Sequence, residues 1–140
     1  MILKNSASLL KTLKAQLEVC KKYLNIQTEM TSALVAGDIK QVDLIVRDEQ
    51  SYIMKIESLE KQREKLLEQE LLRGLSISEI TVNHLEEEEK EEYKYVTDNL
   101  ISILIDLKKV NALNQKLLKQ RLSVLEHIVQ VNEMEIVKRA

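Results

Sequence analysis

The C-terminal part of the chain carries an uninterrupted helical pattern of apolar residues. From Tyr93 to about residue 135, apolar side chains recur at alternating steps of three and four, with no glycine or proline. This spacing places them on one wide face of a single helix, predicted over about residues 86–135. Polar residues interrupt the face at four positions: Asn111, Asn114, Arg121 and Asn132. An apolar face this wide must pack against other helices, a partner or both. Its polar positions restrict which surfaces can pack against it.

Two earlier segments carry the same kind of pattern. Leucines seven residues apart predict a heptad-like helix over about residues 3–35. A second apolar stripe predicts a helix over about residues 39–72. Between them, Gly37 can adopt the left-handed conformation that ends a helix, and Asp38 can cap the next one. A junction this short predicts that the two helices are antiparallel and pack side by side.

The stretch before the last helix is less regular. Residues 75–85 predict a short crossing helix or loop, and the acidic run EEEEKEE that follows suits the positive N-terminal end of a helix. We therefore predict an all-α fold: an antiparallel bundle or coiled coil of three long helices, forming a single domain over residues 1–140. The last helix is the longest, so part of it is expected to lack a neighbour within the chain.

Composition supports this fold and narrows the function. The chain has 140 residues, which fits one domain, and its 44% hydrophobic content without proline, tryptophan or phenylalanine is typical of a helical bundle. A net charge of −2 does not favour nucleic acid as a partner. The single cysteine, Cys20, suits a reducing cytosol. The apolar runs are too short for a membrane span, and the start does not resemble a signal peptide, so we predict a cytoplasmic protein without membrane insertion.

The candidate chemical groups do not form a recognisable site. The two histidines, His84 and His127, lack the spacing to glutamates that a helical two-metal site requires. The glycines are isolated, so no phosphate-binding loop is present. Cys20 falls on the apolar stripe and is interpreted as a small buried hydrophobe. We predict no catalytic residues, no metal and no cofactor.

Two alternative functions stay open at this stage. Arg47, Lys55 and Arg63 lie at eight-residue steps and could line the pocket of a small all-helical enzyme that acts on a dicarboxylate. Such spacing also arises by chance on a charged helix, which makes this the weaker alternative. The other is a structural coiled-coil oligomer without a client.

The asparagines of the last helix allow two interpretations. They are either structural residues, buried to fix the register of packed helices or placed at the edge of the face, or groups that bond to a bound segment. In a bundle formed within the chain, each buried amide must find a partner or cost about 1–3 kcal/mol. Pattern alone favours the first interpretation.

Three stretches together resemble the FlgN family of flagellar type III export chaperones. The first is LVAGD at residues 34–38, between two long helices. The second is the stretch 39–63, which contains IESLE and ends in KQR. The third is an asparagine pattern followed by paired leucines in the last helix: Asn111, Asn114, Leu117 and Leu118.

The resemblance implies a non-enzymatic chaperone that binds hook-associated proteins of the flagellum. Such a chaperone prevents their premature assembly or degradation and delivers them to components of the export apparatus. The clients are expected to bind through C-terminal helical segments that dock into an apolar groove. In this family the C-terminal helical region is linked to client binding. The residues predicted to contact the partner are Leu104, Leu107, Val110, Asn111, Asn114, Leu117, Leu118, Arg121, Leu125 and Ile128.

Overall fold

The computed structural model describes residues 6–69 and 87–139, without the side chains of several residues after Ser123. Helix α1 spans Ser6–Ala36, α2 spans Ile39–Gln69 and α4 spans Glu87–Arg139. These bounds compare with predicted ranges of about 3–35, 39–72 and 86–135. The predicted all-α fold of three long helices is confirmed. The predicted crossing segment at 75–85 lies outside the described residues, and the assignment of the whole chain to one domain stays a prediction.

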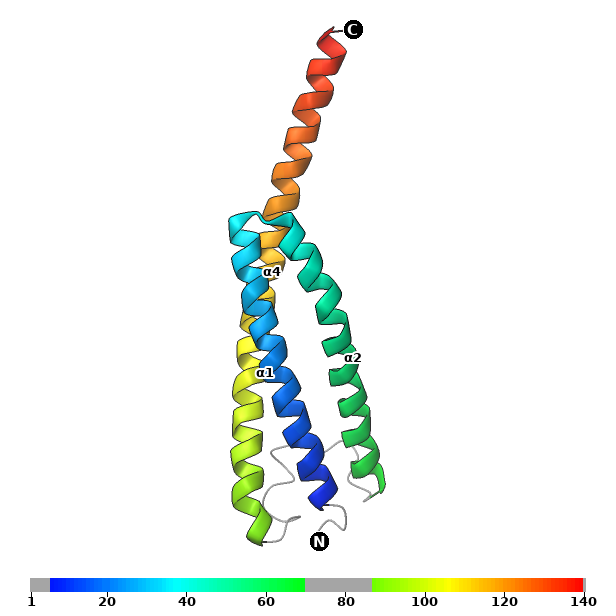
Figure 1. Cartoon of the computed structure of the whole chain (residues 1–140), viewed down its shortest axis with the longest axis vertical. Coiled ribbons are helices and arrows are strands. Elements are labelled where there is room, and N and C mark those ends of the chain that lie inside the picture. The colour runs from blue at the N-terminus through cyan, green and yellow to red at the C-terminus, as the bar shows by residue number, and fades with distance from the viewer. Residues whose placement is uncertain (1–5, 70–86, 140) are drawn as a thin grey trace.

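Helices α1 and α2 form an antiparallel hairpin, and α4 runs parallel to α1 (Figure 1). The parallel direction follows from contacts at both ends of the pair. Ser6 Oγ donates a hydrogen bond to Glu89 Oε1 near the start of both helices, and Arg121 of α4 reaches Leu34 near the end of α1. Helix α1 therefore lies between its two neighbours and packs against both. Beyond the hairpin turn α4 continues alone, as its length led us to expect (Figure 1).

The α1–α2 turn is built as its residues predict. Gly37 has a φ of 69°, and its N–H donates to the Leu34 carbonyl at 3.2 Å. The Asp38 N–H donates to the Ala33 carbonyl at 3.0 Å, which completes a Schellman motif. The Asp38 carboxylate then accepts from the Gln41 N–H at 3.1 Å and caps α2. Asp38 thus takes part both in the end of α1, through its N–H, and in the start of α2, through its carboxylate.

The core is formed mainly by the seam between α1 and α4. Its larger cluster of buried residues has one member from α2, Leu67. The whole cluster consists of Leu9, Leu10, Leu13, Leu17, Cys20, Leu67, Tyr93, Val96, Leu100 and Leu107. A smaller cluster near the hairpin turn consists of Met30, Ala33 and Leu34 from α1 and Ile45 from α2. Many apolar residues of α2 stay partly or fully exposed. Helix α2 therefore packs less deeply than α4 on the shared helix α1.

The acidic run lies where the pattern placed it, at the start of α4. Glu87, Glu88 and Glu89 occupy the first turn, where the helix dipole favours negative charge. Lys90 pairs with Glu87 at 2.8 Å, and Lys14 of α1 pairs with Glu92. Cys20 is buried, as predicted, and burial, followed by the charge of Glu60, raises the pKa of its thiol. Among the described helices, none contains a segment long and apolar enough to cross a bilayer.

Candidate functional site

Asn114 lies in the seam between α4 and α1 and is 6% exposed. Its Nδ2 donates to the backbone carbonyl of Gln27 at 2.9 Å and to the Gln27 side-chain Oε1 at 3.1 Å. Thr31 Oγ1 donates to Asn114 Oδ1 at 2.5 Å. The amide nitrogen and the amide oxygen are therefore both satisfied within the chain. These contacts agree with the first interpretation of the asparagines, that of a buried residue that fixes helix register.

The same network continues into α2. The Gln27 side chain is buried, and its Nε2 donates to Glu49 Oε2 at 2.6 Å. Asn114, Gln27 and Glu49 thus link α4, α1 and α2 in one line of hydrogen bonds. In the sequence, Gln27 is a polar gap in a row of apolar residues seven positions apart on α1: Leu13, Cys20 and Leu34. The structure explains the gap, since an apolar residue there would leave Asn114 without its side-chain acceptor.

A pocket of about 270 Å³ opens beside this network, between α2 and α4. All three helices contribute to its lining: Tyr23, Gln27, Met30, Leu34, Val42, Val46, Glu49, Asn111, Asn114, Gln115 and Leu118. Its walls are largely apolar, and its polar groups are four side-chain amides, the Tyr23 hydroxyl and the Glu49 carboxylate. Burial, followed by the charge of Glu49, raises the pKa of Tyr23. The pocket can hold an apolar or amphipathic side chain, with polar groups available for a specific contact.

The predicted partner-binding residues occupy different environments. Asn111 and Leu118 are exposed and line the pocket, and Leu104 is also exposed on the same seven-residue row of α4. Leu107 is buried in the larger core cluster, and Leu117 packs on the smaller one. Val110 is partly buried, and the side chains of Leu125 and Ile128 lie outside the described residues. Partner contact stays a prediction for all of them.

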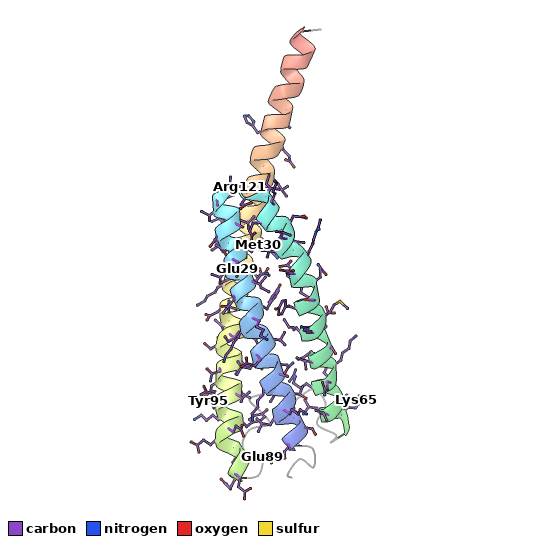
Figure 2. All side chains as sticks on the ribbon, viewed as in Figure 1. Glu29, Met30, Lys65, Glu89, Tyr95 and Arg121 are labelled. Atoms are coloured by element: carbon purple, nitrogen blue, oxygen red, sulfur yellow. The ribbon has the colours of Figure 1, made fainter. Side chains whose placement is uncertain are left out.

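Arg121 has a specific role within the fold. Its Nε donates to the Leu34 carbonyl at 2.9 Å, and one terminal nitrogen donates to the Val35 carbonyl at 2.7 Å. These carbonyls belong to the last turn of α1, where the helix dipole is negative and a cation is favourable. Figure 2 shows Arg121 at the level of the hairpin turn. Its guanidinium lies about 3.3–3.4 Å from the position that a Cβ on Gly37 would take, so the turn and α4 fit closely.

Sequence reasoning on α4 missed the pocket residues supplied by the other two helices. Val42, Val46 and Glu49 come from α2, while Tyr23 and Met30 come from α1. The apolar stripe of α2 could have indicated them, because it contains more apolar residues than the described core buries. Val46 is 41% exposed although it belongs to that stripe.

A second polar contact joins α1 to α2 farther from the turn. The buried Gln16 donates through Nε2 to Glu60 Oε2 at 2.9 Å, and Arg63 pairs with the same carboxylate. The hydrogen bond and charge of Arg63 lower the pKa of Glu60, assisted by Gln16 and opposed by burial. The head of Arg63 is thus engaged by Glu60, and its side chain is 16% exposed.

This lowered pKa predicts a pH-dependent loss of stability. The unfolded chain binds the proton of Glu60 more readily than the folded chain, so the contribution is complete above about pH 4.5 and is lost as the pH falls through the folded pKa. We expect Glu60→Gln to be less stable than wild type near neutral pH and the difference to shrink on acidification. Urea unfolding of both proteins across this range measures it. A difference that stays constant with pH would contradict the assignment.

The three cations of the dicarboxylate alternative each have a partner on α2. Arg47 pairs with Asp43 at 3.1 Å, and the Lys55 ammonium lies 5.2 Å from the centre of the Tyr52 ring. Arg63 pairs with Glu60. None of the three lines the pocket between α2 and α4. Within residues 6–69 and 87–139, no three histidine, cysteine, aspartate or glutamate side chains lie close enough together to hold a metal ion.

Comparison with protein families identifies the chain. The family model FlgN, described as FlgN protein, matches residues 1–132. No curated protein and no solved structure matches the sequence. The match includes both helices of the hairpin and all of α4 that packs beside it. The chain therefore belongs to the FlgN family of flagellar export chaperones.

Proposed function

We propose that this protein is a cytoplasmic chaperone that binds hook-associated flagellar proteins. It prevents their premature assembly or degradation and delivers them to components of the type III export apparatus. Membership of the FlgN family supports this role in general terms, because it suggests that the protein is a flagellar export chaperone for hook-associated proteins. The proposed action is non-enzymatic and needs no cofactor.

The client site is proposed to be the groove between α2 and α4. The observation that carries this placement is the pocket lined by all three helices, with exposed apolar residues beside it. Leu118 is 45% exposed, and Leu104, two heptads earlier on the same row, is 44% exposed. Val46 faces the same pocket from α2. An amphipathic helix from a client can bury these side chains by the helix-in-groove mode.

Within the predicted set, Asn111 and Leu118 are the best placed to contact a client. Both line the pocket and are exposed to solvent. Leu107 and Leu117 stabilise the bundle, and Asn114 and Arg121 hold α1 against α4. Substitution of these four residues would weaken the fold and binding together. Tests of binding should therefore use residues outside the core.

Leu118→Ala is expected to weaken capture of hook-associated proteins about tenfold, as expected for an apolar anchor at the centre of an interface. Leu113→Ala is the matched control, because Leu113 is also 45% exposed on α4 but does not line the pocket. Purified hook-associated proteins from the same bacterium can be titrated with each variant by calorimetry. Both variants should retain the helical circular dichroism signal of the wild type.

Two results would contradict the proposal. If Leu113→Ala weakens capture as much as Leu118→Ala, the groove is not the client site. If the tagged wild-type chain retains only further copies of itself from a lysate of flagellated cells, the role as a chaperone fails. That second result would favour the structural coiled-coil oligomer.

A further inference from the structure

The α1–α2 hairpin contains two equivalent contacts between a buried glutamine and a glutamate. Gln16 donates to Glu60, and Gln27 donates to Glu49. Eleven residues, about three helical turns, separate the two glutamines on α1 and the two glutamates on α2. The two contacts therefore lie on the same faces of the two helices and repeat one arrangement in two places.

The two contacts differ in their cation. Three residues after Glu60 stands Arg63, which pairs with it. The residue three positions after Glu49 is Tyr52, which is uncharged. The ammonium group of Lys55 lies over the Tyr52 ring. In the described part of the chain, Glu49 accepts a hydrogen bond from Gln27 and forms no ion pair. The arrangement is complete at Glu60 and lacks its cation at Glu49.

The contact without a cation is the one that borders the pocket. Glu49 is partly buried there, and much of the surrounding wall is aliphatic: Met30, Leu34, Val42, Val46 and Leu118. A segment that covered this pocket with apolar side chains alone would remove water from a carboxylate without pairing it, which is unfavourable. A segment that presents a lysine or arginine among its apolar residues avoids that cost. The aliphatic stem of either residue can follow the wall while the charged group reaches Glu49.

We infer that the pocket receives a lysine or arginine side chain from the docked client helix and that Glu49 pairs with this cation. This inference rests on the proposed function and specifies the chemistry of the client segment: an amphipathic helix with one cation within its apolar face. The pair would set the register of the client helix, because apolar anchors alone tolerate a shift by one turn. It would also select against segments with an acidic or purely apolar residue at that position.

The test compares Glu49→Gln with Asp48→Asn as the matched control. Each removes one negative charge from neighbouring positions of α2, and Asp48 is exposed and does not line the pocket. Glutamine at position 49 retains an oxygen that can accept the bond from Gln27. Calorimetric titration with purified hook-associated proteins from the same bacterium is expected to show about tenfold weaker binding for Glu49→Gln and little change for Asp48→Asn.

The outcomes separate this inference from the proposed function. If the wild-type chain binds no hook-associated protein, the proposed function fails. If the wild type binds and Glu49→Gln binds equally well, or if Asp48→Asn loses as much, the cation pocket is wrong while the chaperone role stands.

A second measurement does not depend on the folding of Glu49→Gln. Val46→Cys, labelled with a benzophenone maleimide, places a photocrosslinker one turn from Glu49, and the buried Cys20 is shielded from the label. The crosslinked client peptide is expected to contain a lysine or arginine on its apolar face. Changing that client residue to glutamate should abolish binding, and Glu49→Lys should restore it. A crosslinked segment without a basic residue, or a charge swap without recovery, would overturn the inference.

Discussion

Replacing Leu13 with alanine is expected to lower the free energy of unfolding by about 2–5 kcal/mol. Leu13 is fully buried in the seam where α1 packs on α4. The substitution removes most of a side chain and leaves a cavity that two long helices cannot readily close. Because domains of this size are stable by only about 5–15 kcal/mol, the loss is a large share of the total. Urea unfolding followed by circular dichroism measures it.

Leu113→Ala serves as the control for the same leucine-to-alanine change at an exposed site. It should cost well under about 1 kcal/mol, since surface substitutions rarely exceed about 0.5 kcal/mol. A similar small cost at Leu13 would mean that the α1–α4 seam is not the main source of stability. The client-binding variants lie on the side of α2 and α4 that contributes less to the core, so binding and stability should respond to different substitutions.

Asn114→Ala is expected to destabilise the fold by about 1–3 kcal/mol, although alanine is the better helix former. The change leaves Gln27 Oε1 and Thr31 Oγ1 without their partner on α4. Asn111→Ala is the control: it makes the same chemical change one turn earlier, at an exposed position. That variant should retain wild-type stability. Equal losses at both positions would contradict the assignment of Asn114 to the seam.

A double substitution tests the role of the polar layer, the buried amides of Gln27 and Asn114. Gln27→Leu combined with Asn114→Leu removes both amides, so neither is left unsatisfied, but Glu49 loses the hydrogen bond from Gln27. Because Glu49 borders the open pocket, where water can replace that bond, stability should stay close to that of the wild type. The amides would then be retained for register or for client binding and not for stability. We expect the double variant to bind hook-associated proteins more weakly, because Gln27 also positions Glu49. Full binding by the double variant would show that the layer serves neither purpose at the client site.

Local features of the chain were predictable because they depend on nearby residues. The apolar periodicity predicted each long helix, and Gly37 with Asp38 predicted the turn between the first two. A left-handed glycine and a capping carboxylate act within a few residues of themselves, so the sequence contains the cause. The predicted cytoplasmic location remains a proposal that the family supports in general terms. The predicted client contacts stay predictions.

The candidate site depended on which faces meet, and the sequence of α4 alone does not contain that information. Leu117 and Leu118 are neighbours in one motif, yet Leu117 packs on the core and Leu118 borders the pocket. The same division separates the buried Asn114 from the exposed Asn111. One residue along a helix turns the side chain by about 100°, so the position of α1 decides which member of each pair is covered.

Amino-acid sequence by itself thus determined three long helices, their junction and a wide apolar face on the last of them. Only the tertiary structure decided that α1 takes the seam of that face, that Arg121 closes the end of α1, and that Glu49 of α2 borders the remaining groove. The physical reason is the range of the interactions involved. Helix periodicity and caps act within a few residues, whereas the groove and its charge arise where three helices distant in sequence pack together.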